Sequence, residues 1–220
     1  MGQPRTAAEP EPSPEARRLA RKSRRQDNRR QQILRAAREV LLASGPEAFT
    51  MEQVARAADA SKAALYYYFE AKEEVVAALA IEALRREVEA VSAAVIAAER
   101  GIDGLAALLR GRVEHYLADP DSFRILYTWA PTLGATQRLV LAEILPLTAV
   151  VSQTLEAKLQ RDRKAGLLHP DANPARLSQV AWITSHGLLS YAMNQPHPER
   201  GAWRPLCDEA CAALVRGATR

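Results

Sequence analysis

The feature that most constrains the fold is residues 50–69, TMEQVARAADASKAALYYYF, which predict two short helices joined by a tight turn. Thr50, with Gln53 three positions later, forms a capping box that places the start of the first helix at the next residue. One apolar face then follows at helical spacing, formed by Met51, Val54, Ala55 and Ala58. The break at Asp59-Ala60 ends this pattern.

The second helix is predicted to expose a face suited to a DNA groove. Ser61 is its N-cap, and Leu65 and Phe69 anchor it in the core. The residues that then point outward are Lys62, Ala63, Tyr66 and Tyr67. Small residues allow close approach to a groove, and hydroxyls reach phosphates. An ordinary helical hairpin with aromatic core residues is the alternative for this segment taken alone.

The flanking sequence supports a DNA-binding pair of helices over an ordinary helical hairpin. Residues 29–44 form an amphipathic helix that ends at Gly45-Pro46, and Lys72 opens a long helix. The order RxxIL-AA…G…FTMEQVA…SKxxLYYYFxxKEEV, over about residues 27–87, resembles the TetR family of bacterial transcription regulators. Its most specific part is the string LYxYFxxK. The resemblance implies a three-helix DNA-binding domain in which residues 51–58 support a recognition helix at residues 62–68.

The resemblance also implies which residues contact DNA. Thr50, Tyr66, Tyr67 and Lys72 fall at positions where the family contacts phosphates or groove edges. Residues of the second helix complete the expected set, namely Ser61, Lys62, Ala63 and Ala64. Alanines 63 and 64 replace the usual glycine and threonine, which leaves methyl groups able to touch thymine methyls.

Two further departures concern the ends of helices. Asp59 replaces the usual turn glycine, and aspartate accepts a left-handed conformation better than most residues. Ala71 stands where the family often has a capping Ser or Asn. Lys72 follows it, and a cation in the first turn opposes the helix dipole. A bound DNA phosphate would reverse that cost, so Lys72 is expected to contact phosphate rather than to be an ordinary surface lysine.

Charge is concentrated near the N-terminus. The formal net charge is +4, yet residues 17–30 carry eight basic residues against one acidic residue, a net +7, which leaves −3 for the rest. This asymmetry indicates nucleic acid at one end of the molecule. The run, with Arg24 and Arg25 at its centre, is interpreted as an arm that contacts DNA; a solvated extension of the first helix is the alternative. Residues 1–26 are expected to be a disordered basic extension.

The body is predicted to be helical as well, since strand-like alternation is absent. Helices are expected at residues 72–99, 105–118, 121–129, 136–164, 174–194 and 205–216, with a break at residues 101–104. The fold class is therefore all-α, with a DNA-binding domain at residues 27–87 and a body at residues 88–220. The resemblance implies that this body binds a ligand and dimerises, its last two long helices forming a four-helix bundle with their copies.

Aromatic and imidazole side chains of the body can line a pocket for an apolar or aromatic effector. They are His115, Tyr116, Tyr127, Trp129, Trp182 and His186. Taken alone, each of them is better interpreted as a satisfied core residue. Residues 177–198 carry no charge but are too polar to span a membrane, so a subunit interface is expected there and the chain is expected to be soluble and cytoplasmic.

Catalytic and metal-binding patterns are lacking in the sequence. It has no phosphate loop, GxSxG, HExxH or Rossmann glycine pattern, so neither enzymatic activity nor a cofactor is expected. Cys207 and Cys211 are four residues apart on a helix, which suits a metal pair only if other ligands converge; they are interpreted as buried apolar residues, with no metal expected. The sequence thus predicts a homodimeric repressor that binds a palindromic operator and is released by a small molecule. A dimeric DNA-binding protein that senses no ligand is the alternative.

Overall fold

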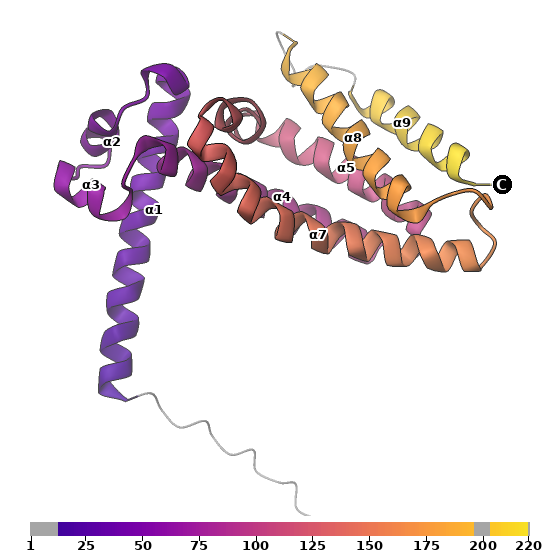
Figure 1. The fold of residues 1–220 in the computed structure, drawn as a ribbon, viewed down its shortest axis with the longest axis horizontal. Helices are drawn as coiled ribbons and strands as arrows, with labels where there is room; N and C mark the ends of the chain where they lie inside the picture. The colour runs from indigo at the N-terminus through magenta and orange to yellow at the C-terminus, as the bar shows by residue number, and fades with distance from the viewer. Residues whose placement is uncertain (1–12, 196–202, 220) are drawn as a thin grey trace, which may run out of the picture. The chain divides into compact units, whose positions relative to one another are not determined.

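The computed structural model describes residues 13–195 and 203–219, and every regular element in these ranges is helical (Figure 1). The predicted all-α class is confirmed. The chain divides into two compact units, one reaching Glu70 and the other beginning at Ala71. The second unit contains the whole of the long helix that the sequence analysis divided at residue 87, and this helix packs along other helices of the same unit.

The first unit contains three helices: α1 (Pro14–Ala48), α2 (Met51–Ala57) and α3 (Lys62–Tyr68). Gly45 interrupts α1 with φ 75° and ψ 169°, at the position where the sequence predicted the first helix to end. At its other end α1 is longer than expected. Residues 14–26, assigned from the sequence to a disordered extension, are helical, while residues 1–12 lie outside the described part.

The core of this unit draws on all three helices. Ile33 and Leu41 of α1, Val54 of α2, and Leu65 of α3 are fully buried, with Phe69 just beyond α3. Burying each such side chain stabilises the fold by about 1.5–3 kcal/mol. The apolar stripes of α2 and α3 are thus buried in the core, and their opposite faces are exposed to solvent.

The second unit contains eight helical elements in the described ranges. They are α4 (Lys72–Ala97), α5 (Gly101–Ala118), α6 (Pro120–Phe123), the π-helix η1 (Arg124–Trp129), the 3₁₀-helix η2 (Ala130–Thr132), α7 (Gly134–Lys164), α8 (Pro174–Met193) and α9 (Trp203–Ala218). Helices α4 and α7 run side by side, and α8 and α9 pack on each other and on α5 (Figure 1).

The start of α5 corrects one prediction. Gly101 and Gly104 were expected to lie in a break between two helices, but they form the first turn of α5. A Cβ on Gly101 would lie 2.4 Å from the backbone nitrogen of Leu159, so only glycine lets α5 approach α7 this closely. The Asp162 carboxylate accepts a hydrogen bond from the backbone N–H of Ile102 at 2.9 Å and satisfies one free donor of this helix end.

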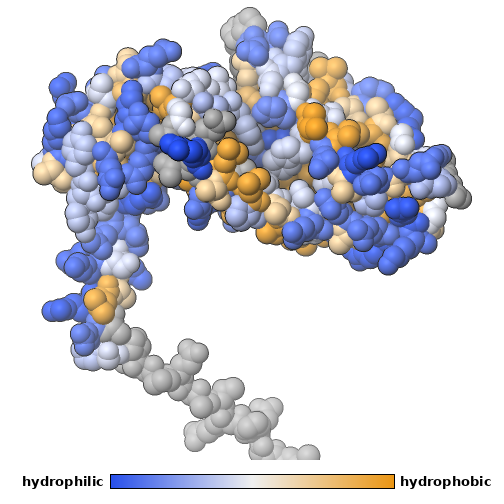
Figure 2. Space-filling model, in the orientation of Figure 1, coloured by the Kyte–Doolittle hydropathy of each residue, from blue (hydrophilic) through white to orange (hydrophobic). Residues whose placement is uncertain are grey.

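The surface of the body is unevenly apolar. Figure 2 shows hydrophobic residues gathered at several places on the visible face of this unit. One stretch of α7, Val140–Lys164, is long and apolar enough to cross a membrane by length and composition alone. It is not the segment at residues 177–198 that the sequence singled out, most of which forms α8. Core helices of soluble proteins pass the same test, so this observation carries little weight by itself.

Candidate nucleic-acid interface and effector site

Both helices of the motif begin at the caps that the sequence predicts. The Thr50 hydroxyl accepts a hydrogen bond from the backbone N–H of Gln53 at 3.3 Å, and the Gln53 side chain accepts one from the backbone N–H of Thr50 at 2.9 Å. Ser61 accepts the backbone N–H of Ala64 at 3.1 Å and caps α3. The predicted capping box and the second N-cap are confirmed, and together they fix where the two helices start.

The turn between α2 and α3 adopts the left-handed conformation predicted for its aspartate. Asp59 has φ 45°, and it is the only residue other than glycine with positive φ in the described part. The Arg29 guanidinium of α1 donates a hydrogen bond to the Asp59 carbonyl at 2.8 Å. The turn is therefore tied to the first helix as well as to the two helices it joins.

The exposed face of α3 is the face that the sequence predicted. Lys62 and Ala63 are exposed, Tyr66 is 43% exposed and Tyr67 is 69% exposed. Ala64 is half-buried, between this face and the core. The face combines one cation, small side chains and two phenol groups, a set that can approach a DNA groove and hydrogen-bond to phosphates.

Lys62 has an acidic partner that the sequence analysis did not foresee. Its ammonium lies 2.6 Å from the Glu52 carboxylate of α2. This hydrogen bond and ion pair raise the pKa of Lys62 and lower that of Glu52. Both groups are exposed, so the pair is screened by salt and contributes little to stability. A DNA phosphate can therefore compete with Glu52 for the same ammonium.

Helix α1 supports the recognition helix directly. The Gln26 amide donates to the Tyr67 hydroxyl at 2.9 Å, and the Arg30 guanidinium lies 5.0 Å from the Phe69 ring centroid. Arg24 and Arg25 are exposed on the same helix, just before these contacts. The basic run is thus a helical continuation of α1 in the described part.

Lys72 is the first residue of α4 and belongs to the second unit. Its predecessor Ala71 is the N-cap and makes no side-chain capping bond, as the sequence predicted. Two acidic residues in the first turn, Glu73 and Glu74, offset the unfavourable position of this cation in the helix dipole.

The most unusual feature of the body is a buried ion pair. Arg112 of α5 and Glu87 of α4 are both fully buried, and the guanidinium Nε lies 2.6 Å from a Glu87 oxygen. Burial is the largest single influence and disfavours the charged form of Arg112, but Glu87, Tyr127 and Tyr116 together outweigh it and raise the Arg112 pKa. Two charges at this depth are tolerated only when hydrogen bonds satisfy their remaining polar atoms.

Four neighbours supply those bonds. Arg112 donates to the Ser185 hydroxyl at 2.7 Å, to the Tyr127 hydroxyl at 2.9 Å and to the Trp182 carbonyl at 3.2 Å. It also lies 3.9 Å from the Trp182 ring centroid. Tyr127 donates to Glu87 at 2.9 Å, and Tyr116 donates to the same oxygen. We call these six residues the polar cluster; they are Glu87, Arg112, Tyr116, Tyr127, Trp182 and Ser185.

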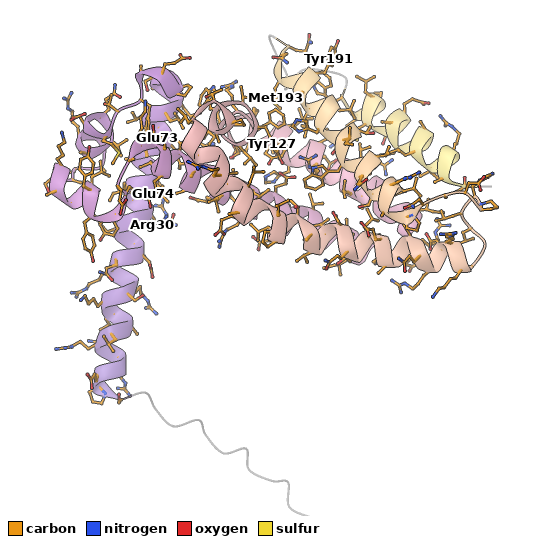
Figure 3. All side chains as sticks on the ribbon, viewed as in Figure 1. Arg30, Glu73, Glu74, Tyr127, Tyr191 and Met193 are labelled. Carbon is orange, nitrogen blue, oxygen red and sulfur yellow. The ribbon has the colours of Figure 1, made fainter. Side chains whose placement is uncertain are left out.

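The structure gathers most of the predicted effector residues here. Tyr116, Tyr127 and Trp182 belong to the polar cluster, and Figure 3 shows Tyr127 inside the body. His115 and His186 flank it, with ring centroids 4.9 Å from those of Tyr116 and Tyr127 respectively. Burial lowers the pKa of both histidines. His115 Nε2 is a buried polar atom without a hydrogen-bond partner in the described part.

Trp129 is placed differently from the other five. It ends the π-helix η1, where its carbonyl accepts a hydrogen bond from Thr132 at 2.7 Å, and among the described residues no hydrogen bond or ring contact joins its side chain to the polar cluster. Three residues of the cluster were missed from the sequence, namely Glu87, Arg112 and Ser185. A signal existed for the charged two: each interrupts an apolar stripe at helical spacing, Glu87 between Leu84 and Val91, and Arg112 between Leu108 and Tyr116.

Comparison with known proteins gives matches to one protein family and to solved structures. Residues 33–79 match the family described as "Bacterial regulatory proteins, tetR family". No curated protein sequence matches the chain significantly. A TetR family transcription regulator from Marinobacter aquaeolei VT8 is 20% identical, with a TM-score of 0.62 over 90% of this chain and 100% of its own.

Two further solved structures show the same fold. The TetR family transcriptional regulator PfmR from Thermus thermophilus is 21% identical, with a TM-score of 0.63 over 86% of this chain and 99% of its own. The transcriptional regulator FadR from Bacillus subtilis, solved in complex with stearoyl-CoA, is 18% identical, with a TM-score of 0.68 over 85% of this chain and 98% of its own. Residues 33–79, which include the capped helix-turn-helix and its exposed face, thus form a DNA-binding domain of the TetR family, and the chain as a whole shares the fold of solved TetR family regulators.

Proposed function

We propose that this protein is a homodimeric repressor that binds a palindromic operator and is released by a small-molecule effector. The observation that carries the DNA-binding part is the exposed face of α3, where Lys62, Ala63, Tyr66 and Tyr67 stand on a helix fixed by two buried anchors. A recognition helix held in this way presents its side chains to a major groove without having to reorganise.

The contacts divide by what they recognise. Tyr66, Lys72 and the capping hydroxyls of Thr50 and Ser61 bind phosphates and set the register of the protein on the duplex. Other residues along α3 read base edges; these are Lys62, Ala63, Ala64 and Tyr67. Arg24 and Arg25, on the helical extension of α1, add backbone contacts outside the major groove.

The dimer is proposed to form through α8 and α9. One side of α8 packs in the body, while its other side exposes an apolar stripe with Val180 44%, Ile183 68% and Tyr191 60% exposed. Gly187 interrupts the stripe and permits a close helix approach, and Leu206 of α9 is 47% exposed. A second copy of the same surface buries these side chains across a two-fold axis. We refer to Val180, Ile183, Gly187 and Tyr191 as the α8 stripe.

The effector is proposed to bind near the polar cluster and to be largely apolar or aromatic. Tyr127, Trp182 and His186 are half-buried there and offer ring faces beside polar tips. The π-helix that carries Tyr127 is a rare element that is frequent at functional sites. FadR, which shares this fold, was solved in complex with stearoyl-CoA, and this supports a largely apolar effector.

A second candidate function has its own support. Glu87, Arg112 and Tyr116 are fully buried, and they satisfy one another's hydrogen bonds inside the body. A core that is already complete needs no ligand, which favours a dimeric DNA-binding protein whose body serves only assembly. In either case we propose a cytoplasmic regulator without catalytic activity or a cofactor.

The experiment is a fluorescence-anisotropy titration of the dimer on its own upstream DNA, with a scrambled duplex as the control. The proposed function requires tighter binding to the native duplex by about 10³-fold or more. A ligand library is then added to the complex. Release by one compound from the native protein, lost in Trp182→Ala but kept in Trp129→Ala, supports the effector site. Equal affinity for both duplexes would contradict the proposal, and retention of the complex with every compound would favour the second candidate.

A further inference from the structure

The two cysteines of the chain form a pair that none of the functions above uses. Cys207 and Cys211 lie on adjacent turns of α9, both buried against α5 and both free thiols. The interaction between the two thiols raises the pKa of Cys207 and lowers that of Cys211. Cys211 also points at the Ala106 carbonyl, with the sulfur 3.9 Å from that oxygen. The two thiols thus lie one turn apart on the face of α9 that packs against α5.

A pocket borders Cys207. It has a volume of about 550 Å³ and lies between α5 and the first turns of α9. Cys207 forms part of its wall beside apolar Val113 and Leu117, and Arg110 stands at the same wall with its guanidinium 2.8 Å from Asp208. The pocket brings open space to the wall that Cys207 forms, whereas the other surroundings of the two cysteines are packed apolar core.

The geometry does not favour a disulfide. Side chains four residues apart on a helix have their Cβ atoms about 5–6 Å apart. A disulfide requires about 3.5–4.5 Å between these atoms, so its formation would distort α9. A single ion placed between the sulfurs bridges the longer distance, since two metal–sulfur bonds of about 2.3 Å each span roughly 4.6 Å.

We propose that Cys207 and Cys211 bind one soft, two-coordinate cation of the Cu(I) or Hg(II) type. In the described residues no third His, Cys, Asp or Glu joins them to make a larger metal-binding group, which disfavours four-coordinate Zn(II) and oxygen-seeking Mg(II) or Ca(II). Thiolates select soft cations. On binding, each thiol loses its proton to solvent as a metal–sulfur bond forms. With Cu(I), two thiolates leave one net negative charge, which the neighbouring Arg110 guanidinium stabilises.

The test is a titration of the full-length reduced protein with Cu(I) under anaerobic conditions, in competition with a chromophoric chelator. Parallel titrations use Hg(II) and Zn(II). We expect one Cu(I) or one Hg(II) per chain, and a loss of affinity of roughly 100-fold or more in Cys207→Ser and in Cys211→Ser, because each removes one arm of a chelate. Ala210→Ser, which adds the same hydroxyl to α9 but keeps both thiols, should bind like the native protein.

Three results would overturn the proposal. They are native affinity equal to that of the double serine variant, full affinity in either single variant, and Zn(II) binding as tight as Cu(I) binding. A measurement on the native sequence covers the case in which a variant does not fold: Cu(I) should protect both cysteines from alkylation, as read by mass spectrometry, and alkylation at the unprotected rate would count against the site. No DNA is present, so these outcomes are independent of the proposed regulator function.

Discussion

At the turn between α2 and α3, Asp59 adopts a backbone conformation that costs an L-residue about 1–2 kcal/mol. The carbonyl of this residue is held by Arg29, and Ser61 two positions later caps α3. This hydrogen bond and this cap offset the conformational cost at Asp59, and the same turn orients α3. This single position therefore connects local backbone chemistry to the presentation of the recognition helix.

Substitution at Asp59 should separate backbone strain from side-chain function. Asp59→Gly should be at least as stable as the native protein, because glycine adopts positive φ without steric cost. Asp59→Val should lose about 1–2 kcal/mol, because a β-branched residue adopts it poorly. Urea unfolding at one fixed protein concentration measures both. Equal stability of the glycine and valine variants would show that the turn relaxes freely.

The buried ion pair makes a second residue-scale prediction. Glu87→Gln or Arg112→Met should each destabilise the body by about 3–5 kcal/mol, because each leaves a buried charge without its partner. The double variant Glu87→Gln/Arg112→Met should lose much less than the sum of the two, since it removes both charges. Urea unfolding of the three variants measures the difference. Simple additivity would mean that the pair does not interact.

DNA contacts can be sorted by the kind of loss they produce. Tyr66→Phe or Lys72→Ala should weaken binding to all duplexes alike, because phosphate contacts position the protein without reading sequence. Tyr67→Phe or Ala63→Ser should change the order of operator preference instead. Anisotropy on a panel of single-base operator variants measures both effects, with Lys164→Ala, an exposed lysine at the end of α7, as the matched control. Altered base preference in Lys72→Ala would contradict its assigned role.

At the scale of elements, α1 combines two tasks. From Ile33 onward it supplies core side chains, and between Gln26 and Arg30 it contacts α3 and the turn. Before Gln26 it is an exposed basic helix in which Arg24 and Arg25 lie. The core and the support for α3 therefore lie entirely after residue 25, and the basic part can be removed without touching them.

Deletion of residues 1–25 tests the basic helix. If this helix touches DNA, the truncated protein should bind more weakly, and the slope of log affinity against log salt should become shallower by about 0.9 for each phosphate that the protein no longer neutralises. Dimerisation and ligand response should persist, because both are proposed for the body. Anisotropy titrations over a series from about 50 to about 200 mM salt give the slope. An unchanged slope would identify the run as a solvated extension.

At the scale of the whole molecule, the two units carry largely separate proposed tasks: DNA recognition by the first unit, to which Lys72 at the start of the second adds a phosphate contact, and assembly with sensing by the rest of the second unit. The α8 stripe is exposed on one side of α8, and Ser185 of the polar cluster lies on its buried side. A single helix thus borders both the proposed dimer interface and the proposed effector site. A ligand that shifts α8 at the proposed effector site would therefore also shift the α8 stripe at the proposed dimer interface.

A charge in the α8 stripe should break the dimer. Ile183→Lys should raise the dimer dissociation constant by roughly 100-fold or more, because burying an unpaired ammonium costs several kcal/mol. Leu167→Lys, which adds the same charge at another exposed apolar residue, is the matched control. Sedimentation velocity across a concentration series measures the constant. An Ile183→Lys protein that stays dimeric would place the interface elsewhere.

The sequence by itself determined the DNA-binding motif, because that information is local. Caps at Thr50 and Ser61, apolar spacing through Leu65 and a left-handed aspartate depend on residues within a few positions of one another. The long helices of the body were found for the same reason, since periodicity persists over many turns. The break near Gly101 was misplaced, because only the approach of α7 shows why glycine is needed there.

Tertiary structure alone decided which distant side chains meet. Glu87 and Arg112 are 25 positions apart, and Arg112 and Ser185 are 73 apart, so no sequence window contains the polar cluster. The same holds for Lys62 with Glu52 and for Tyr67 with Gln26, pairs made by the packing of different helices. Local propensity and spacing specify helices and the faces they bury. The partners on those faces depend on how the helices pack, and packing is a property of the whole chain.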